Sequence, residues 1–291
     1  MHSKTGHFPC RIVCLSAESA DILFRLGAGK RIAGVSVFAA LPVGAERIPR
    51  VSGFDSANLD RIRQLEPDLI IAYSDVQAKL VEALVRDGFT ILATNQRTLE
   101  EIAETIELLG RMVGRGEGGE KLANEFRAGC RGGLRPPFAA DIAGDGHRPP
   151  LQQDPPSVYF EEWNDPLISG ICWVSELIEI AGGRDIFPEF RACKKAEQRV
   201  VSAEEVARRD PEIIIASWCG KKADLESIRS RPGWAKIKAV RDDQVHEMDS
   251  SIILQPGPVL FEGLAELKRL VAKARQTAYA NAGSGRHDDG P

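Results

Sequence analysis

The sequence predicts an α/β fold with two parallel-sheet α/β lobes joined by a helical connector. Two stretches, Glu66–Ser74 and Asp210–Trp218, each contain an acid, a proline, a second acid and a short aliphatic run. Each stretch follows an amphipathic helix. The proline ends that helix because it disfavours helical geometry in the preceding residue, and the uninterrupted aliphatic run indicates a strand covered on both faces. One unit of helix, proline and buried strand therefore occurs twice.

The first lobe is expected to span residues 11–97, because strand and helix patterns alternate there. Helices between successive strands predict a parallel sheet with right-handed crossovers. In chain order, the predicted elements are a strand at 11–15, a helix at 20–26, strand 31–37, helix 59–65, strand 69–72, helix 76–87 and strand 89–93.

Residues 98–131 are predicted to form the helical connector. Thr98 and Glu101 have the spacing of a capping box at a helix start, and a second amphipathic helix is expected at about 119–130. Residues 132–156 are rich in proline and glycine and lack periodicity, which predicts a solvated insertion.

The second lobe is expected to span residues 157–276, followed by a disordered tail at 277–291. Ser202 and Glu205 have the spacing of another capping box. The predicted elements are a strand at 157–161, an irregular loop at 162–170, a helix at 173–180, a helix from Ser202 to Pro211, a strand over the aliphatic run after Pro211, a strand at 245–248 and a helix at 259–273.

Composition excludes several classes of protein. With 291 residues, a net charge of −4 and a pI near 5.9, the chain has no basic stripe for nucleic acid. No apolar run approaches the roughly 18 residues of a membrane helix. Residues 1–9 are polar and do not form a signal peptide, so the expected location is cytoplasmic as given, or periplasmic if the true N-terminus is missing. The six cysteines lack CxxC spacing, which fits a reducing compartment better than a disulfide framework.

Candidate ligand-binding residues follow the strands, because ligands of parallel sheets gather at the carboxyl ends of strands. Their aromatic rings suit a large flat ligand with much apolar area. The alternative for Trp163 and Trp218 is ordinary packing on the surface of the lobe. The candidates are Ser16, Phe38, Tyr73, Ser74 and Asp75 in the first lobe, and Glu161, Glu162, Trp163, Ser217 and Trp218 in the second.

Three cysteines of the second lobe are candidate metal ligands. Cys193 and Cys219 each have a lysine pair beside them, and Cys172 lies near the start of a helix. Ammonium groups and helix amino termini favour thiolate, the form that binds soft metals or an iron–sulfur cluster. The alternative is that Cys172 and Cys14 are small core residues and that the lysines form a solvated rim.

The order of elements resembles the class III solute-binding proteins of ABC importers, which take cobalamin, ferric siderophores or haem. The likeness covers residues 11–275 and is carried by the repeated proline unit, the helical connector, Leu15-Ser16 and Ala181-Gly182-Gly183. It is greatest to the cobalamin-binding type. The resemblance implies two rigid lobes, a ligand cleft between them and an ABC permease as partner.

The chain departs from that family at positions that bear on its ligand and its partner. It has Tyr73 where cobalamin binders present tryptophan, and Asp249-Ser250-Ser251 where they place aromatic residues. Gln77-Ala78-Lys79 stands where the family has an acidic residue that docks on the permease.

The sequence contains no recognisable catalytic constellation. His246 is the only histidine well inside the predicted lobes, and neighbouring residues on a strand, such as Glu161 and Glu162, point to opposite faces. The leading hypothesis is therefore a solute-binding protein for a corrinoid (cobalamin-like) ligand or another large metal chelate, such as a ferric chelate. The alternatives are a cytoplasmic thiolate metal or iron–sulfur cluster protein on the same fold, and an enzyme acting on a small ligand.

Overall fold

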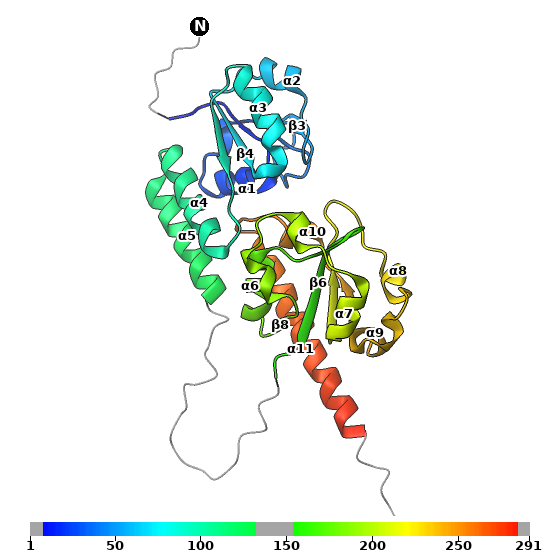
Figure 1. Ribbon diagram of the computed structural model, residues 1–291. Coiled ribbons are helices and arrows are strands. Elements are labelled where there is room, and N and C mark those ends of the chain that lie inside the picture. Colours follow the sequence, from blue (N-terminus) through cyan, green and yellow to red (C-terminus); the bar gives the residue numbers. More distant parts are fainter. Residues whose placement is uncertain (1–7, 132–153, 285–291) are drawn as a thin grey trace, which may run out of the picture. The chain divides into compact units, whose positions relative to one another are not determined.

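The computed structural model describes residues 8–131 and 154–284 (Figure 1). These residues form two compact units. Of the described residues, lobe 1 comprises 8–128 and Gln255–Leu260, and lobe 2 comprises 129–131, 154–254 and 261–284. Each lobe contains its own sheet with helices, as the sequence predicts, and each sheet has five strands. Most of the predicted insertion at 132–156 lies outside the described residues.

The sheet of lobe 1 is parallel throughout and has the strand order β3-β2-β1-β4-β5. The aliphatic side chains of the central strands β1 and β4 are fully buried, as an uninterrupted apolar run predicts. The elements are β1 Ile12–Cys14, α1 Ala17–Arg25, η1 Gly29–Arg31, β2 Ile32–Ser36, β3 Arg50–Ser52, α2 Leu59–Gln64, β4 Leu69–Tyr73, η2 Asp75–Gln77, α3 Ala78–Arg86 and β5 Ile91–Thr94.

Two helices follow this sheet, α4 Leu99–Met112 and α5 Gly116–Arg131, and they lie side by side (Figure 1). The predicted capping box at the start of α4 is confirmed. The Glu101 N–H donates to the Thr98 hydroxyl at 3.1 Å, and the Thr98 N–H donates to the Glu101 carboxylate at 3.1 Å. Arg127 of α5 binds the α4 carboxylates of Glu100 and Glu107, each at 2.7 Å, which fixes the register of the two helices.

Glycine is required where α4 and α5 meet. A Cβ atom at Gly110 would lie 2.7 Å from the Gly119 Cα and 3.0 Å from the Arg115 carbonyl oxygen, both backbone atoms that cannot rotate away. We expect Gly110→Ala to lower the free energy of unfolding by about 1–3 kcal/mol, measured by urea denaturation. Gly118→Ala is the matched control, because its nearest neighbour is the flexible Leu26 side chain at 3.7 Å. Equal stabilities of the two variants would contradict this close packing.

The sheet of lobe 2 has the strand order β10-β9-β6-β7, and β8 pairs with the start of β6. All its pairs are parallel except β6–β7, which is an antiparallel hairpin. The elements are β6 Ser157–Asn164, β7 Leu167–Ser169, α6 Cys172–Ile180, β8 Arg184–Asp185, η3 Pro188–Ala192, η4 Ala196–Arg199, α7 Ala203–Arg209, β9 Ile213–Ala216, α8 Leu225–Arg229, η5 Trp234–Lys236, α9 Lys238–Arg241, β10 Val245–Glu247, α10 Ser250–Ile253 and α11 Leu260–Ser284.

The structure corrects three sequence-based boundaries. Residues 162–170 are not an irregular loop, because β6 continues to Asn164 and turns back through β7. The helix predicted at 259–273 extends as α11 to Ser284, so the first part of the predicted disordered tail is helical. Between the predicted strand 31–37 and the predicted helix 59–65 the structure has a further strand, β3, which is three residues long and too short to show periodicity.

The duplicated stretch keeps the same local geometry in both lobes. Glu66 and Asp210, the residues before the prolines, both have left-handed backbone conformations with φ of 43° and 46°. The second acid of each stretch holds the first strand of its lobe. Asp68 accepts the backbone N–H of Arg11 at 2.9 Å, and Glu212 accepts that of Ser157 at 2.8 Å.

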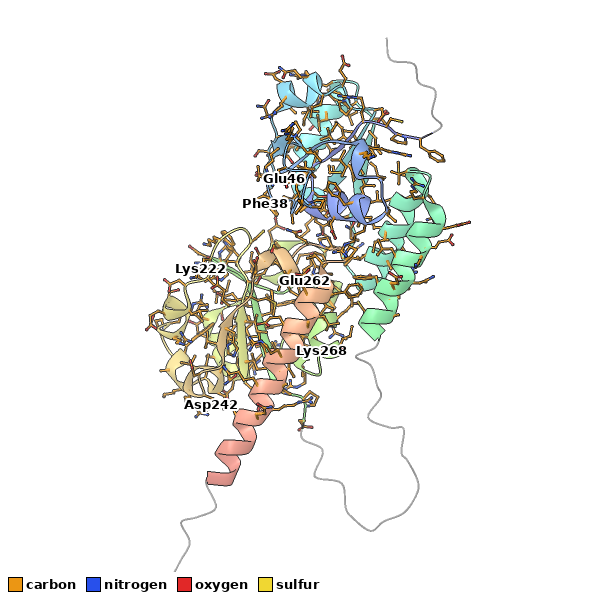
Figure 2. The ribbon with its side chains drawn as sticks, turned by 180° about the vertical axis from the view of Figure 1, so that it is seen from behind. Phe38, Glu46, Lys222, Asp242, Glu262 and Lys268 are labelled. Atoms are coloured by element: carbon orange, nitrogen blue, oxygen red, sulfur yellow. The ribbon has the colours of Figure 1, made fainter. Side chains whose placement is uncertain are left out.

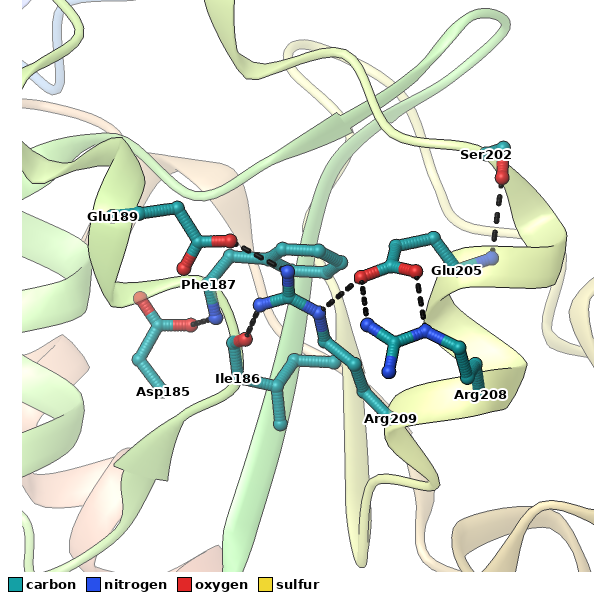
Figure 3. A network of polar contacts seen from close by, with 8 residues as sticks. All are labelled: Asp185, Ile186, Phe187, Glu189, Ser202, Glu205, Arg208 and Arg209. Atoms are coloured by element: carbon teal, nitrogen blue, oxygen red, sulfur yellow. Dashed lines mark hydrogen bonds and ion pairs between the residues drawn. The ribbon is translucent and has the colours of Figure 1, made fainter.

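A network of charged side chains joins α7 to the segment after β8 (Figure 3). Arg209 binds Glu189 and Glu205, each at 2.6 Å, and its guanidinium carbon lies 4.2 Å from the centroid of the Phe187 ring. The Glu205 N–H donates to the Ser202 hydroxyl at 3.1 Å, as a capping box requires. The Glu205 carboxylate, however, binds Arg208 and Arg209 (Figure 3). It is therefore part of the charged network, and does not accept the Ser202 backbone N–H as a complete capping box would require.

Candidate ligand-binding site

Exposed apolar side chains follow three strands of the lobe 1 sheet, the neighbours β2 and β3 and, on the other side of β1, β4. Val37 and Phe38 follow β2, Phe54 follows β3 and Val76 follows β4. Phe38 is 44% exposed and Phe54 is 53% exposed. Figure 2 shows Phe38 on the loop after β2. Because the strands are parallel, their carboxyl ends meet at one edge of the sheet, and the apolar side chains share that edge. We call this set the apolar edge of lobe 1.

Polar side chains occupy the same edge after β4 and β5. Arg97 forms an ion pair with Asp75 at 2.7 Å and donates a hydrogen bond to the Tyr73 hydroxyl at 3.2 Å. The Tyr73 hydroxyl in turn donates to the backbone carbonyl of Gln96 at 3.2 Å. Two predicted residues, Tyr73 and Asp75, are therefore brought together by Arg97. The sequence reasoning missed Arg97 and Gln96, although both follow the predicted strand that became β5.

The serines of lobe 1 shape the turns after β1 and β4. Ser16 is buried and donates to the Ser19 hydroxyl at 3.0 Å. Ser74 is buried, has φ of 58° and accepts the N–H of Val76 at 3.3 Å. Glu18 lies two residues after Ser16, and burial raises the pKa of its carboxyl group to about 7. One of the Glu18 carboxyl oxygens has no hydrogen-bond partner among the described residues.

In lobe 2, Glu161 is fully buried and is the centre of a core ion pair. Its two oxygens bind Arg231 at 2.5 and 2.8 Å, and the Trp218 indole N–H donates to the carboxylate at 3.0 Å. The Trp218 ring is 4% exposed and packs in the core cluster with Trp234. These positions differ from the open, ligand-facing ones expected from sequence, because Trp218 packs in one core cluster with Ile228 of α8 and Trp234 of η5. Ser217 is also completely buried, and its hydroxyl has no partner among the described residues.

Glu162 and Trp163 are closer to the surface of lobe 2. Glu162 binds Arg199 at 2.6 and 3.1 Å. Trp163 is half-buried, and the Lys221 ammonium lies 4.2 Å from the centroid of its ring and 4.9 Å from that of Trp218. Lys221 therefore provides a cation held between two indole rings at this edge.

The cysteines do not form the predicted metal site. Within residues 8–131 and 154–284, no three His, Cys, Asp or Glu side chains are grouped to hold a metal ion, so Cys172, Cys193 and Cys219 do not converge. Burial, and then the charge of Glu162, raise the pKa of Cys219 to about 11, which opposes thiolate. The neighbouring Lys221 lies over the indole rings. Cys172 is a buried residue of α6.

None of the helices in the described part of the chain is both long enough and apolar enough to span a bilayer.

Comparison with known proteins gives consistent matches over most of the chain. The family model described as periplasmic binding protein matches residues 12–131 and 139–252. The vitamin B12-binding protein of Vibrio cholerae serotype O1 is 28% identical over 265 residues, which are 89% of this chain and 88% of that protein. The uncharacterized ABC transporter substrate-binding lipoprotein YvrC of Bacillus subtilis is 25% identical over 268 residues, covering 89% and 79% of the two chains. The crystal structure of the periplasmic vitamin B12-binding protein of Vibrio cholerae has a TM-score of 0.68 at 26% identity, covering 92% of this chain and 98% of that one.

These matches support a binding protein and not an enzyme, since the family binds solutes. The relatives are named as periplasmic or as a lipoprotein, so they give no support to a cytoplasmic location. None of these three is named as an iron–sulfur protein. The chain therefore belongs to the periplasmic binding protein family, and within it to the class III solute-binding proteins.

Proposed function

We propose that this chain is the solute-binding protein of an ABC importer and that its ligand is a corrinoid or another large metal chelate. The vitamin B12-binding protein among its relatives and the ABC transporter lipoprotein of Bacillus subtilis support the two parts of this proposal. A protein with this role meets its ligand outside the cytoplasm, in agreement with the names of these relatives.

The apolar edge of lobe 1 is the observation that carries the ligand class. Phe38 and Phe54 are about half exposed and follow neighbouring strands, together with Val37 and Val76. Phenyl rings that remain in water do not gain the favourable free energy of burial. Clusters of exposed apolar side chains therefore commonly mark a binding surface. A large flat ligand would cover this area and needs few polar anchors.

Lobe 2 supports the same ligand class through Trp163 and Lys221. The half-buried indole ring offers a flat apolar surface, and Lys221 offers an ammonium group at the same strand edge. Together they suit a ligand that combines an extended ring with polar substituents.

The importer partner would have to be recognised without the family's acidic residue near α3. Gln77, which takes that position, is buried, and its amide donates to the carbonyls of Leu15 and Phe54 and accepts the Tyr73 N–H. The Gln77 side chain therefore holds lobe 1 together, and docking on a permease would depend on other surface residues.

Titration calorimetry with cyanocobalamin, haemin and a ferric hydroxamate siderophore tests this function. We expect saturable binding of at least one chelate. We also expect Phe38→Ala to weaken it about tenfold, because a buried phenyl ring contributes on the order of 1.5–3 kcal/mol. Val85→Ala is the matched control, since Val85 is 56% exposed on α3, away from the strand ends. If none of the three chelates binds, the proposed function is wrong.

A further inference from the structure

Gln96 is a buried glutamine whose side-chain amide has no hydrogen-bond partner in the described part of the chain. It lies two residues after β5 and two residues before Thr98, the N-cap of α4. Its residue exposure is 2%, and neither its amide nitrogen nor its amide oxygen has a hydrogen-bond partner among the described residues. Burying polar atoms without partners costs free energy, and such atoms are rare in folded proteins. A ligand that pairs with the amide would remove this cost.

The surroundings of Gln96 belong to the ligand-facing edge of lobe 1. Its backbone carbonyl accepts the Tyr73 hydroxyl at 3.2 Å, and the next residue, Arg97, carries a buried Nε atom that also lacks a partner within the described residues. The Arg97 charge is compensated, because Asp75 lies 2.7 Å from its guanidinium. This part of the edge therefore combines unused hydrogen-bonding groups with a paired charge, which favours a neutral polar ligand group over an anion.

We propose that Gln96 is a specificity-determining residue that pairs with a primary amide of the ligand. The glutamine amide offers both a donor and an acceptor, and a primary amide offers the same two groups in return. A carboxylate has acceptors only, so it would leave the Gln96 oxygen unpaired. A corrin ring carries primary amides on its side chains, whereas haem carries carboxylates. The inference rests on the proposed function and selects the amide-bearing class among its ligands.

Two variants of Gln96 separate a ligand contact from a structural role. Gln96→Leu removes both polar atoms at similar volume, and Gln96→Glu replaces the donor with an acceptor. We expect both to weaken cyanocobalamin binding about tenfold or more in calorimetry, because Gln96→Leu removes both partners of the ligand amide and Gln96→Glu leaves the ligand carbonyl without a donor. The melting temperature of ligand-free Gln96→Leu should be equal to or higher than that of the wild type, because no hydrogen bond among the described residues is lost.

Gln77→Leu is the matched stability control, since Gln77 is similarly buried but its amide nitrogen and oxygen are both hydrogen-bonded. Its melting temperature should fall. The monocarboxylic acids made from cyanocobalamin by hydrolysis of single amides test the ligand side. The wild type should bind at least one of these acids less tightly than it binds cyanocobalamin. Gln96→Leu should bind that acid and cyanocobalamin with equal affinity.

The outcomes distinguish the inference from the function on which it rests. If the wild type binds cyanocobalamin and Gln96→Leu binds it equally tightly, the role of Gln96 is disproved and the function stands. If Gln96→Leu lowers the melting temperature as much as Gln77→Leu does, Gln96 is a structural residue and the inference fails. If the wild type binds haemin more tightly than cyanocobalamin, the amide selectivity fails while the binding function stands. If the wild type binds no chelate, both fail.

Discussion

Arg231→Met should lower the free energy of unfolding by about 3–5 kcal/mol, because it leaves a buried carboxylate without its counter-charge. Glu161 is completely buried, and after the substitution its carboxylate would keep the Trp218 indole N–H as a donor but no longer have the guanidinium charge. The Arg231 guanidinium carbon also lies 4.6 Å from the centroid of the Trp234 ring, and the methionine side chain preserves part of that packing. Urea denaturation followed by tryptophan fluorescence measures the loss.

A double variant shows whether the loss comes from the uncompensated charge. Glu161→Leu with Arg231→Met replaces both partners by apolar side chains, which usually costs little or even stabilises a protein. We expect the double variant to recover most of the stability that Arg231→Met loses. A double variant as unstable as the single one would show that lost packing, and not the buried charge, is responsible.

The second large effect is a pH dependence that originates at Glu18. Burial raises the pKa of this carboxyl from an ordinary 4.5 to about 7 in the folded chain, with the Ser16 hydroxyl opposing part of the rise, and the Cys14 thiol is the other titratable group beside it. Ionisation is therefore harder in the folded than in the unfolded chain. The Glu18 contribution to stability is largest below pH 4.5, falls as the pH rises to about 7 and is constant above that.

Glu18→Gln should remove this dependence. At 1.36 kcal/mol per pKa unit, the contribution of Glu18 changes by on the order of 3 kcal/mol across that range. The variant should thus gain stability relative to wild type at pH 8 and gain little at pH 4.5, as measured by urea denaturation at both values. Glu104→Gln, which removes an exposed carboxyl from α4, is the control. An equal effect of Glu18→Gln at both pH values would contradict the raised pKa.

Local patterns predicted much of the fold because the physics behind them is local. The prolines at 67 and 211 end helices and precede buried strands in both lobes, and Thr98 with Glu101 caps α4 as expected. The hairpin of β6 and β7 was not predicted, because its pairing depends on residues that contact one another only after the chain turns back. β3 was missed because three residues are too few to show a period.

The positions of the candidate site residues along the strands could be predicted from the sequence, but their burial could not. Phe38 follows β2, Tyr73 is the last residue of β4 and Trp163 lies near the end of β6. Whether Trp218 faces solvent depends on α8 and η5, short elements with no clear pattern of their own. The lysines beside Cys219 suggested a thiolate, but Lys221 instead contacts rings from two different segments. Contacts between residues that are far apart in the sequence cannot be predicted from the spacing of residue types along the chain.

The six residues Gln255–Leu260 make both lobes discontinuous in sequence. They belong to lobe 1, although the residues on either side of them, Leu254 and Phe261, belong to lobe 2. A Cβ atom at Gly257 would lie only 3.1 Å from the Glu18 Cβ, so this segment packs directly on α1. No single cut in the polypeptide can release an intact lobe. A fragment ending at Ala128 would uncover α1 beside Glu18, and recombining two fragments would require one of them to supply these six residues to the other.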